Sequence, residues 1–165
     1  MVAVTSQIIE FIRSIGIRVD FGEIAPEKQF LPGMCIENSG LMIDLNTLKY
    51  PGDLLHEAGH IAVTAPEKRA LIDGVAGGDS DQDQGEAMMA IAWSYAAAKY
   101  LDIDPHIVFH KDGYKGGGIS IVQNFSQGNF FGVPLLQWIG LTYEPKIALE
   151  KNTDPYPKMI KWVRE

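Results

Sequence analysis

The segment that decides the fold is residues 53–63, which read DLLHEAGHIAV. Asp53 is a favourable N-cap residue, so the sequence predicts a helix over this segment. Residues four apart lie on one face of a helix, and His56 and His60 can therefore both bind one metal ion. Glu57 lies about 100° around the helix from His56. Its carboxyl group is therefore placed to reach a water molecule at the ion rather than to ligate the ion.

This arrangement puts two zinc ligands and a general base on one helical turn, the pattern of HExxH hydrolases. In such a site zinc polarises water and an amide carbonyl, and Glu57 accepts the proton. The helix also contains Gly59, although glycine inside a helix costs about 1 kcal/mol relative to alanine. Because Ala58 and Gly59 are small, another element of the fold can approach this helix closely. The pattern therefore indicates a catalytic metal site rather than two unrelated surface histidines.

A catalytic zinc site usually has a third protein ligand and one open position. The extended pattern with a third histidine is absent, because Val63 and Pro66 occupy its glycine and histidine positions. Glu86 is the strongest candidate, since its helix otherwise turns apolar residues inward and a buried carboxylate needs a partner. A favourable position near the helix dipole also explains Glu86. The other candidates for this ligand are Asp73, Asp79, Asp81 and Asp83.

The rest of the chain predicts an α+β fold with a single domain over residues 1–165. The expected helices are residues 5–15, 53–63, 84–101 and 133–141, a short one from Pro105 and an amphipathic one from Pro157. The expected strands are residues 17–21, 34–37, 41–45 and 119–123, and residues 74–85 are an expected loop. The turn at residues 38–40 predicts a hairpin. We therefore expect a small antiparallel sheet packed on the helix of residues 53–63 and on a second, Ala-rich helix.

The composition is that of an acidic globular chain. Its formal net charge is −7 and its basic residues are scattered, so we expect no nucleic acid and no membrane among its partners. No stretch approaches the roughly 20 apolar residues of a membrane span, and residues 1–10 lack the pattern of a signal peptide. Cys35 is the only cysteine, which excludes a disulfide within the chain. We therefore expect a cytoplasmic protein.

Over residues 30–101 the sequence resembles the ImmA/IrrE-type zinc peptidases, which are gluzincin-like. The hairpin ending in LMIDL, the segment HEAGHIA at residues 56–62 and the Ala-rich helix that starts at Glu86-Ala87 carry the resemblance. It implies a zincin-like fold, Zn²⁺ as cofactor and Glu86 as the third zinc ligand. It also implies a protein or peptide substrate, lying along the strand before the active-site helix. Members of the family often cleave repressors or other regulatory proteins, so a selective protease is expected.

The sequence departs from the family in two places. The family has a large residue within its HExxH core where this chain has Ala58, and residues 102–165 do not align. A group that stabilises an oxyanion could come from this second region, where the candidates are His106, His110 and Tyr114. Two alternatives to a peptidase are a non-catalytic zinc-containing protein-binding module and a zinc hydrolase of a non-peptide amide. The intact Glu57 favours an enzyme, because a scaffold has no need of it.

Overall fold

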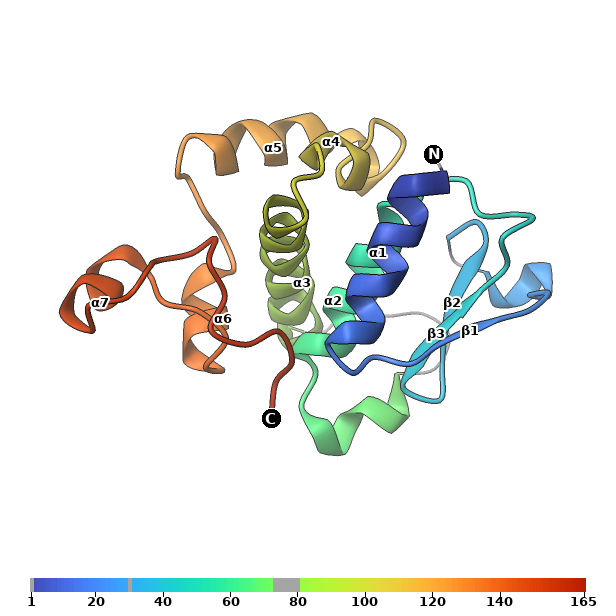
Figure 1. The fold of residues 1–165 in the computed structure, drawn as a ribbon, viewed down its shortest axis with the longest axis horizontal. Coiled ribbons are helices and arrows are strands. Elements are labelled where there is room, and N and C mark those ends of the chain that lie inside the picture. The colour runs from blue at the N-terminus through green and yellow to red at the C-terminus, as the bar shows by residue number, and fades with distance from the viewer. Residues whose placement is uncertain (1, 30, 73–80) are drawn as a thin grey trace.

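The computed structural model describes residues 2–29, 31–72 and 81–165, and for residues 81–83 it describes the backbone alone. Within these residues a small sheet, several α-helices and three short 3-10 helices (η) follow one another. In chain order they are α1 (Val2–Ser14), β1 (Val19–Phe21), η1 (Pro26–Lys28), β2 (Met34–Glu37), β3 (Gly40–Ile43), α2 (Asp53–Val63), η2 (Pro66–Leu71), α3 (Asp81–Tyr100), α4 (Pro105–Val108), η3 (Tyr114–Gly116), α5 (Gly118–Ser126), α6 (Val133–Trp138) and α7 (Pro145–Glu150). In the view of Figure 1, α1 and α2 lie between the sheet and α3. The α+β class expected from the sequence is confirmed.

The hairpin forms where the sequence predicts it. Strands β2 and β3 pair antiparallel, with Met34 opposite Ile43 and Glu37 opposite Gly40. Two residues join them, and both have left-handed backbones, with φ of 50° at Asn38 and 61° at Ser39. Such a turn matches the twist of the two strands, which is why short polar residues occupy it.

The sheet differs from the expected antiparallel one in its third strand. The strand order is β1-β3-β2, and β1 runs parallel to β3, with Val19 opposite Leu41. The sheet is therefore mixed. Strand β3, which precedes α2 in the chain, is central, so among the described strands the two edges belong to β1 and β2. Alternation predicts a strand at residues 17–21, but it carries no information about strand direction.

The close packing of α2 on α3 depends on a glycine. A β-carbon added at Gly59 would lie 3.1 Å from the carbonyl oxygen of Ala90 and 3.2 Å from Cε3 of Trp93. One turn away, the Ser94 hydroxyl lies 3.3 Å from the carbonyl oxygen of Leu55. The two helices therefore run antiparallel in close contact, as the small residues of the HEAGH segment predict. Helix α3 is buried on all sides over residues 92–98, and this explains its many alanines.

The C-terminal third of the chain packs back onto α2 and α3. The Trp93 indole donates to the carbonyl oxygen of Trp162 at 2.8 Å, and the Tyr156 hydroxyl donates to that of Ala92 at 2.8 Å. The backbone N–H of Arg164 donates to the carbonyl oxygen of Ala62, also at 2.8 Å. Residues 102–165, which lie outside the resemblance noted above, therefore contribute to the packing around α2, the helix that carries the HEAGH segment.

Two of the expected elements in this region are wrong. Residues 119–123 are not a strand but the start of α5, in which Val122 and Phe125 are buried three residues apart. A five-residue alternation of apolar residues does not separate a strand from a short helix. The segment from Pro157 does not form a helix. It makes an isolated bridge between Met159 and Thr142, and a helix that the pattern missed, α7, begins earlier, at Pro145.

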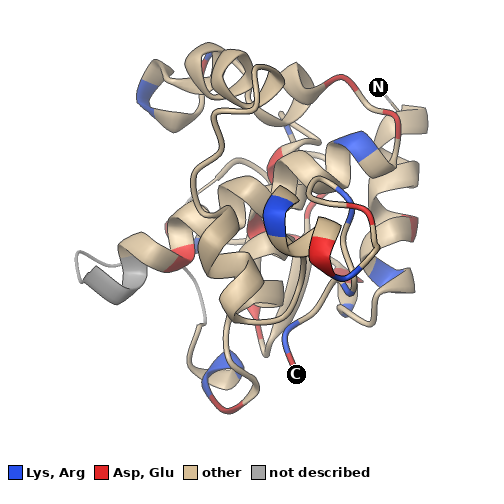
Figure 2. Cartoon of the chain, turned by 90° about the vertical axis from the view of Figure 1, so that its left-hand side faces the viewer, with Lys and Arg blue, Asp and Glu red and all other residues tan. Residues whose placement is uncertain are grey.

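Several expected boundaries also shift. Helix α1 begins at Val2, upstream of the expected start at residue 5, and ends at Ser14, shortly before Gly16 with φ of 88°. Helix α3 begins at Asp81, so residues 81–85 are helical, and the rest of the expected loop, residues 74–80, lies outside the described residues. No helix in the described part of the chain is long and apolar enough to cross a membrane. Lysines and arginines are spread over several elements, with acidic residues among them (Figure 2).

Candidate metal centre

The two histidines of α2 converge through the same ring atom. The Nε2 atoms of His56 and His60 lie 3.1 Å apart, and their ring planes are at 89°. Two nitrogens that bind one tetrahedral zinc at about 2.0–2.1 Å are about 3.3 Å apart. The separation of the histidine pair is therefore close to that of two ligands of one ion.

Both histidines are neutral at physiological pH in the metal-free protein. Burial lowers the pKa of His56 to about 3, with a further contribution from His60, and burial lowers the pKa of His60 to about 4. Neutral imidazole is the form that binds a metal, because protonated imidazole has no free lone pair. The donor chemistry therefore fits a zinc ion at this position.

Glu57 is the buried carboxyl group beside the pair. The Glu57 residue is only 6% exposed to solvent. Burial, followed by the charge of nearby Asp53, raises the pKa of Glu57 to about 8. Without a metal the carboxyl group is therefore protonated at neutral pH, and a bound cation would favour the carboxylate that a general base requires.

Tyr114 contacts the opposite side of the His56 ring. Its hydroxyl oxygen lies 3.1 Å from Nδ1 of His56, and the two rings meet edge to face with centroids 5.2 Å apart. The Tyr114 ring also packs against Phe109, with centroids 5.1 Å apart. Burial raises the pKa of Tyr114 well above its usual value, so the phenol stays neutral.

A second pair lies next to these residues, at the start of α2. Nε2 of His110 is 2.9 Å from Oδ1 of Asp53, and the Tyr50 ring stacks on the His110 ring with centroids 3.8 Å apart. The Tyr50 hydroxyl in turn donates to Asp112. Burial raises the pKa of Asp53, while the hydrogen bond from His110 lowers it. Nδ1 of His110 is buried and has no partner among the described residues.

The role of Asp53 differs from the one predicted from the sequence. The N-cap position of α2 is occupied by Gly52 and not, as the sequence predicts, by Asp53. Asp53 is the first helical residue, and its carboxylate contacts His110. A signal for this was present, because Asp53, His56 and His60 stand at positions i, i+3 and i+7 and so share one helical face. Tyr50, which stacks on His110, also lies beside this pair, and no motif in the sequence marks it.

Of the candidates for the third ligand, only the Glu86 side chain lies within the described residues, and it is not grouped with the histidine pair. Glu86 lies on α3 one turn before Ala90, the residue that meets Gly59, and is partly exposed. Among the described residues no three His, Cys, Asp or Glu side chains are grouped closely enough to hold a metal ion. Asp73 and Asp79 lie outside the described residues, and the side chains of Asp81 and Asp83 are not described. The third ligand therefore stays a prediction.

His106 has a different environment from the other two oxyanion candidates. Its ring Nδ1 lies 2.8 Å from Oδ1 of Asp104, which also accepts the His106 backbone N–H and caps α4. Its side chain is 54% exposed. These contacts pair His106 with Asp104, the N-cap residue of α4, whereas His110 contacts Asp53 and Tyr114 contacts His56, both on α2.

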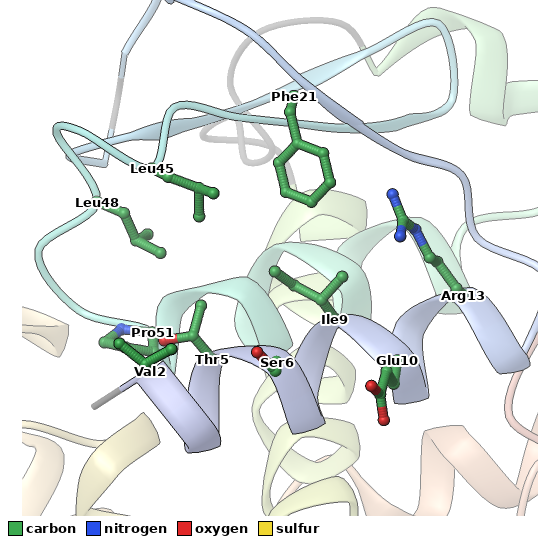
Figure 3. A pocket seen from close by; sticks show the side chains of 10 residues that line it. All are labelled: Val2, Thr5, Ser6, Ile9, Glu10, Arg13, Phe21, Leu45, Leu48 and Pro51. Atoms are coloured by element: carbon green, nitrogen blue, oxygen red, sulfur yellow. The ribbon is translucent and has the colours of Figure 1, made fainter.

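A separate groove lies between α1 and the segment that follows β3 (Figure 3). Its volume is about 560 Å³, and Ile9, Phe21, Leu45 and Leu48 form much of its apolar surface. The described residues that line it do not include the histidine pair, Glu57 or Tyr114. The groove is therefore distinct from the candidate metal centre.

Comparisons with known proteins leave the assignment to the geometry of the site. The chain matches no protein-family model, no curated protein and no solved structure.

Proposed function

We propose that the chain is a zinc-dependent peptidase with a zincin-like site, similar to the ImmA/IrrE-type peptidases. The observation that carries the proposal is the 3.1 Å approach of the His56 and His60 Nε2 atoms, with Glu57 buried on the same helical turn. Two converging neutral imidazoles, with a carboxyl group on the same helical turn, supply two of the ligands and the general base of a hydrolytic zinc site, which a third ligand completes.

The chain's residues divide into holders of the ion and a proton acceptor. His56 and His60 hold zinc through Nε2, and we propose Glu86 as the third ligand because it lies on the face of α3 turned to α2. When bound, zinc acts as a Lewis acid on water and on the scissile carbonyl group. Glu57 accepts the proton of the attacking water and then delivers it to the leaving amine.

The proposed substrate is a peptide bond in a selected protein. Regulatory proteins are the first substrates to test. This part of the proposal rests on the resemblance over residues 30–101. Because β3 is central in the sheet, a peptide that adds to the sheet as a strand would have to pair with β1 or β2. Strand β2 is the antiparallel neighbour of β3, and its Cys35 and Ile36 are buried.

Glu57→Gln tests the proposal. This variant should retain zinc, because Glu57 is not among the proposed ligands, and should cleave about 10²- to 10⁴-fold more slowly, since it lacks the general base. The assay is cleavage of regulatory proteins from the same genome, followed by mass spectrometry, with zinc content measured on the same samples. Glu67→Gln, on the exposed surface of η2, is the matched control.

Three outcomes decide between the alternatives. Loss of cleavage with zinc retained in Glu57→Gln supports the proposal. Undiminished cleavage by Glu57→Gln contradicts the proposed mechanism. If neither form cleaves a protein that both bind equally, a zinc-containing protein-binding module replaces the peptidase.

A further inference from the structure

The contact between Tyr114 and His56 has a direction that matters. An imidazole that binds a metal through Nε2 carries its proton on Nδ1, and that N–H needs an acceptor to hold the ring in place. The Tyr114 hydroxyl oxygen, 3.1 Å from Nδ1, is in position to accept it. A phenol oxygen carries lone pairs that accept hydrogen bonds, so this geometry suits an N–H···O bond from His56 to Tyr114.

The backbone at Tyr114 supports a specific role for its side chain. Tyr114 has φ of 55° and Lys115 has φ of 53°, so two consecutive residues other than glycine are left-handed. This conformation is strained for a bulky side chain, and such strain persists only where surrounding contacts impose it. The Tyr114 ring is therefore held against His56 at a cost in backbone conformation.

The segment that leads to Tyr114 packs against the start of α2. His110, four residues before Tyr114, bonds Asp53 at 2.9 Å. A β-carbon added at Gly52 would lie 2.0 Å from the carbonyl oxygen of Ile107, so only glycine lets this backbone approach so closely. Residues 107–114 are thus fixed to the helix that carries His56.

We propose that Tyr114 is a positioning residue for His56, accepting its Nδ1–H, and that the Asp53–His110 pair holds the segment that presents Tyr114. The role differs from oxyanion stabilisation, because the Tyr114 hydroxyl lies on the side of the ring away from the Nε2 that faces His60. The inference rests on the proposed zinc site but not on peptidase activity.

Zinc affinity under chelator competition is the main test. Tyr114→Phe keeps the ring and removes the acceptor, so zinc affinity should fall about 10- to 100-fold, as when other partners of metal ligands are removed. Tyr100→Phe, on a residue 67% exposed on α3, is the matched control and should bind zinc like wild type. His110→Ala should also weaken zinc binding but add little in the Tyr114→Phe background, since both act through one contact. His110→Gln retains a donor for Asp53 and should restore most of the affinity.

A second measurement does not depend on zinc affinity. In zinc-loaded wild type, ¹⁵N-resolved NMR should show a His56 Nδ1–H that exchanges slowly with water, and in Tyr114→Phe this proton should exchange faster. Rapid exchange in wild type, or unchanged zinc affinity in a folded Tyr114→Phe protein, would overturn the inference. If that variant keeps its zinc but loses turnover, Tyr114 acts on the substrate instead. Wild type that shows the protected proton yet cleaves no protein would uphold the positioning role and contradict the peptidase.

Discussion

Replacing Glu57 with glutamine should remove most of the pH dependence of stability that the metal-free protein shows above pH 6.5. Burial and Asp53 raise the pKa of Glu57 from 4.5 to about 8 in the folded protein. Between these two values the folded chain keeps a proton that the unfolded chain has lost. The free energy of unfolding therefore falls as the pH rises through this window, because the folded state binds more protons.

The magnitude follows from the width of the window. One pKa unit corresponds to about 1.4 kcal/mol, so the fall is about 2 kcal/mol between pH 6.5 and 8 and about 5 kcal/mol over the whole range. The two histidines act in the opposite direction at lower pH. Their pKa values fall from 6.5 to about 3 and about 4, so they make stability rise with pH up to about 6.5, and their remaining effect, under about 1 kcal/mol together, fades by about pH 7.5. Stability should therefore peak near pH 6.5.

The assay is urea unfolding of chelator-treated protein at pH 6.5, 7.2 and 8, followed by circular dichroism. Wild type should lose stability across this range, Glu57→Gln should stay nearly level, and Glu67→Gln should follow wild type. At pH 8 the Glu57→Gln protein should be the more stable one by a few kcal/mol. Parallel curves for wild type and Glu57→Gln would refute the argument that burial holds Glu57 in its neutral form.

Three further predictions concern the metal and the helix packing. Zinc binding at pH 7 should release about one proton more from wild type than from Glu57→Gln, because the cation ionises Glu57. Calorimetry in two buffers of different ionisation enthalpy measures this number of protons. Glu86→Gln should weaken zinc binding at least about tenfold if Glu86 is the third ligand. If substitution of Asp79 or Asp83 weakens zinc binding this much and Glu86→Gln does not, the third ligand is one of these aspartates instead. Gly59→Ala should lower the free energy of unfolding by about 1–3 kcal/mol, because the added β-carbon meets Ala90 and Trp93. A gain of about 1 kcal/mol in urea unfolding would show instead that α3 can shift to accommodate the methyl group.

The features that the sequence predicts well are local ones. The helix of residues 53–63 matches α2, and the polar turn before Gly40 places the hairpin, since capping, periodicity and turn chemistry all act within a few residues. The same local patterns fail where the apolar segment is short. Alternation at residues 119–123 indicates a strand, but burial of Val122 and Phe125 against the core selects the helix α5.

The part of the site that could not be predicted is non-local. The bond between Asp53 and His110 joins residues 57 apart, and the contact between His56 and Tyr114 joins residues 58 apart. No spacing rule reaches across such separations, so His110 and Tyr114 appear in the sequence only as candidates among neighbours such as His106. The fold brings two of these three to α2, while His106 lies in the first turn of α4 and contacts its N-cap residue, Asp104.

Zinc binding to the metal-free protein tests the central claim most directly. Titration with zinc against a competing chelator should show one ion per chain for wild type, with affinity lost in His56→Ala and in His60→Ala. His106→Ala, which removes a side chain 54% exposed at the cap of α4, should bind as wild type does. Equal zinc affinity of wild type, His56→Ala and His60→Ala would contradict the assignment of a metal centre to the HEAGH helix.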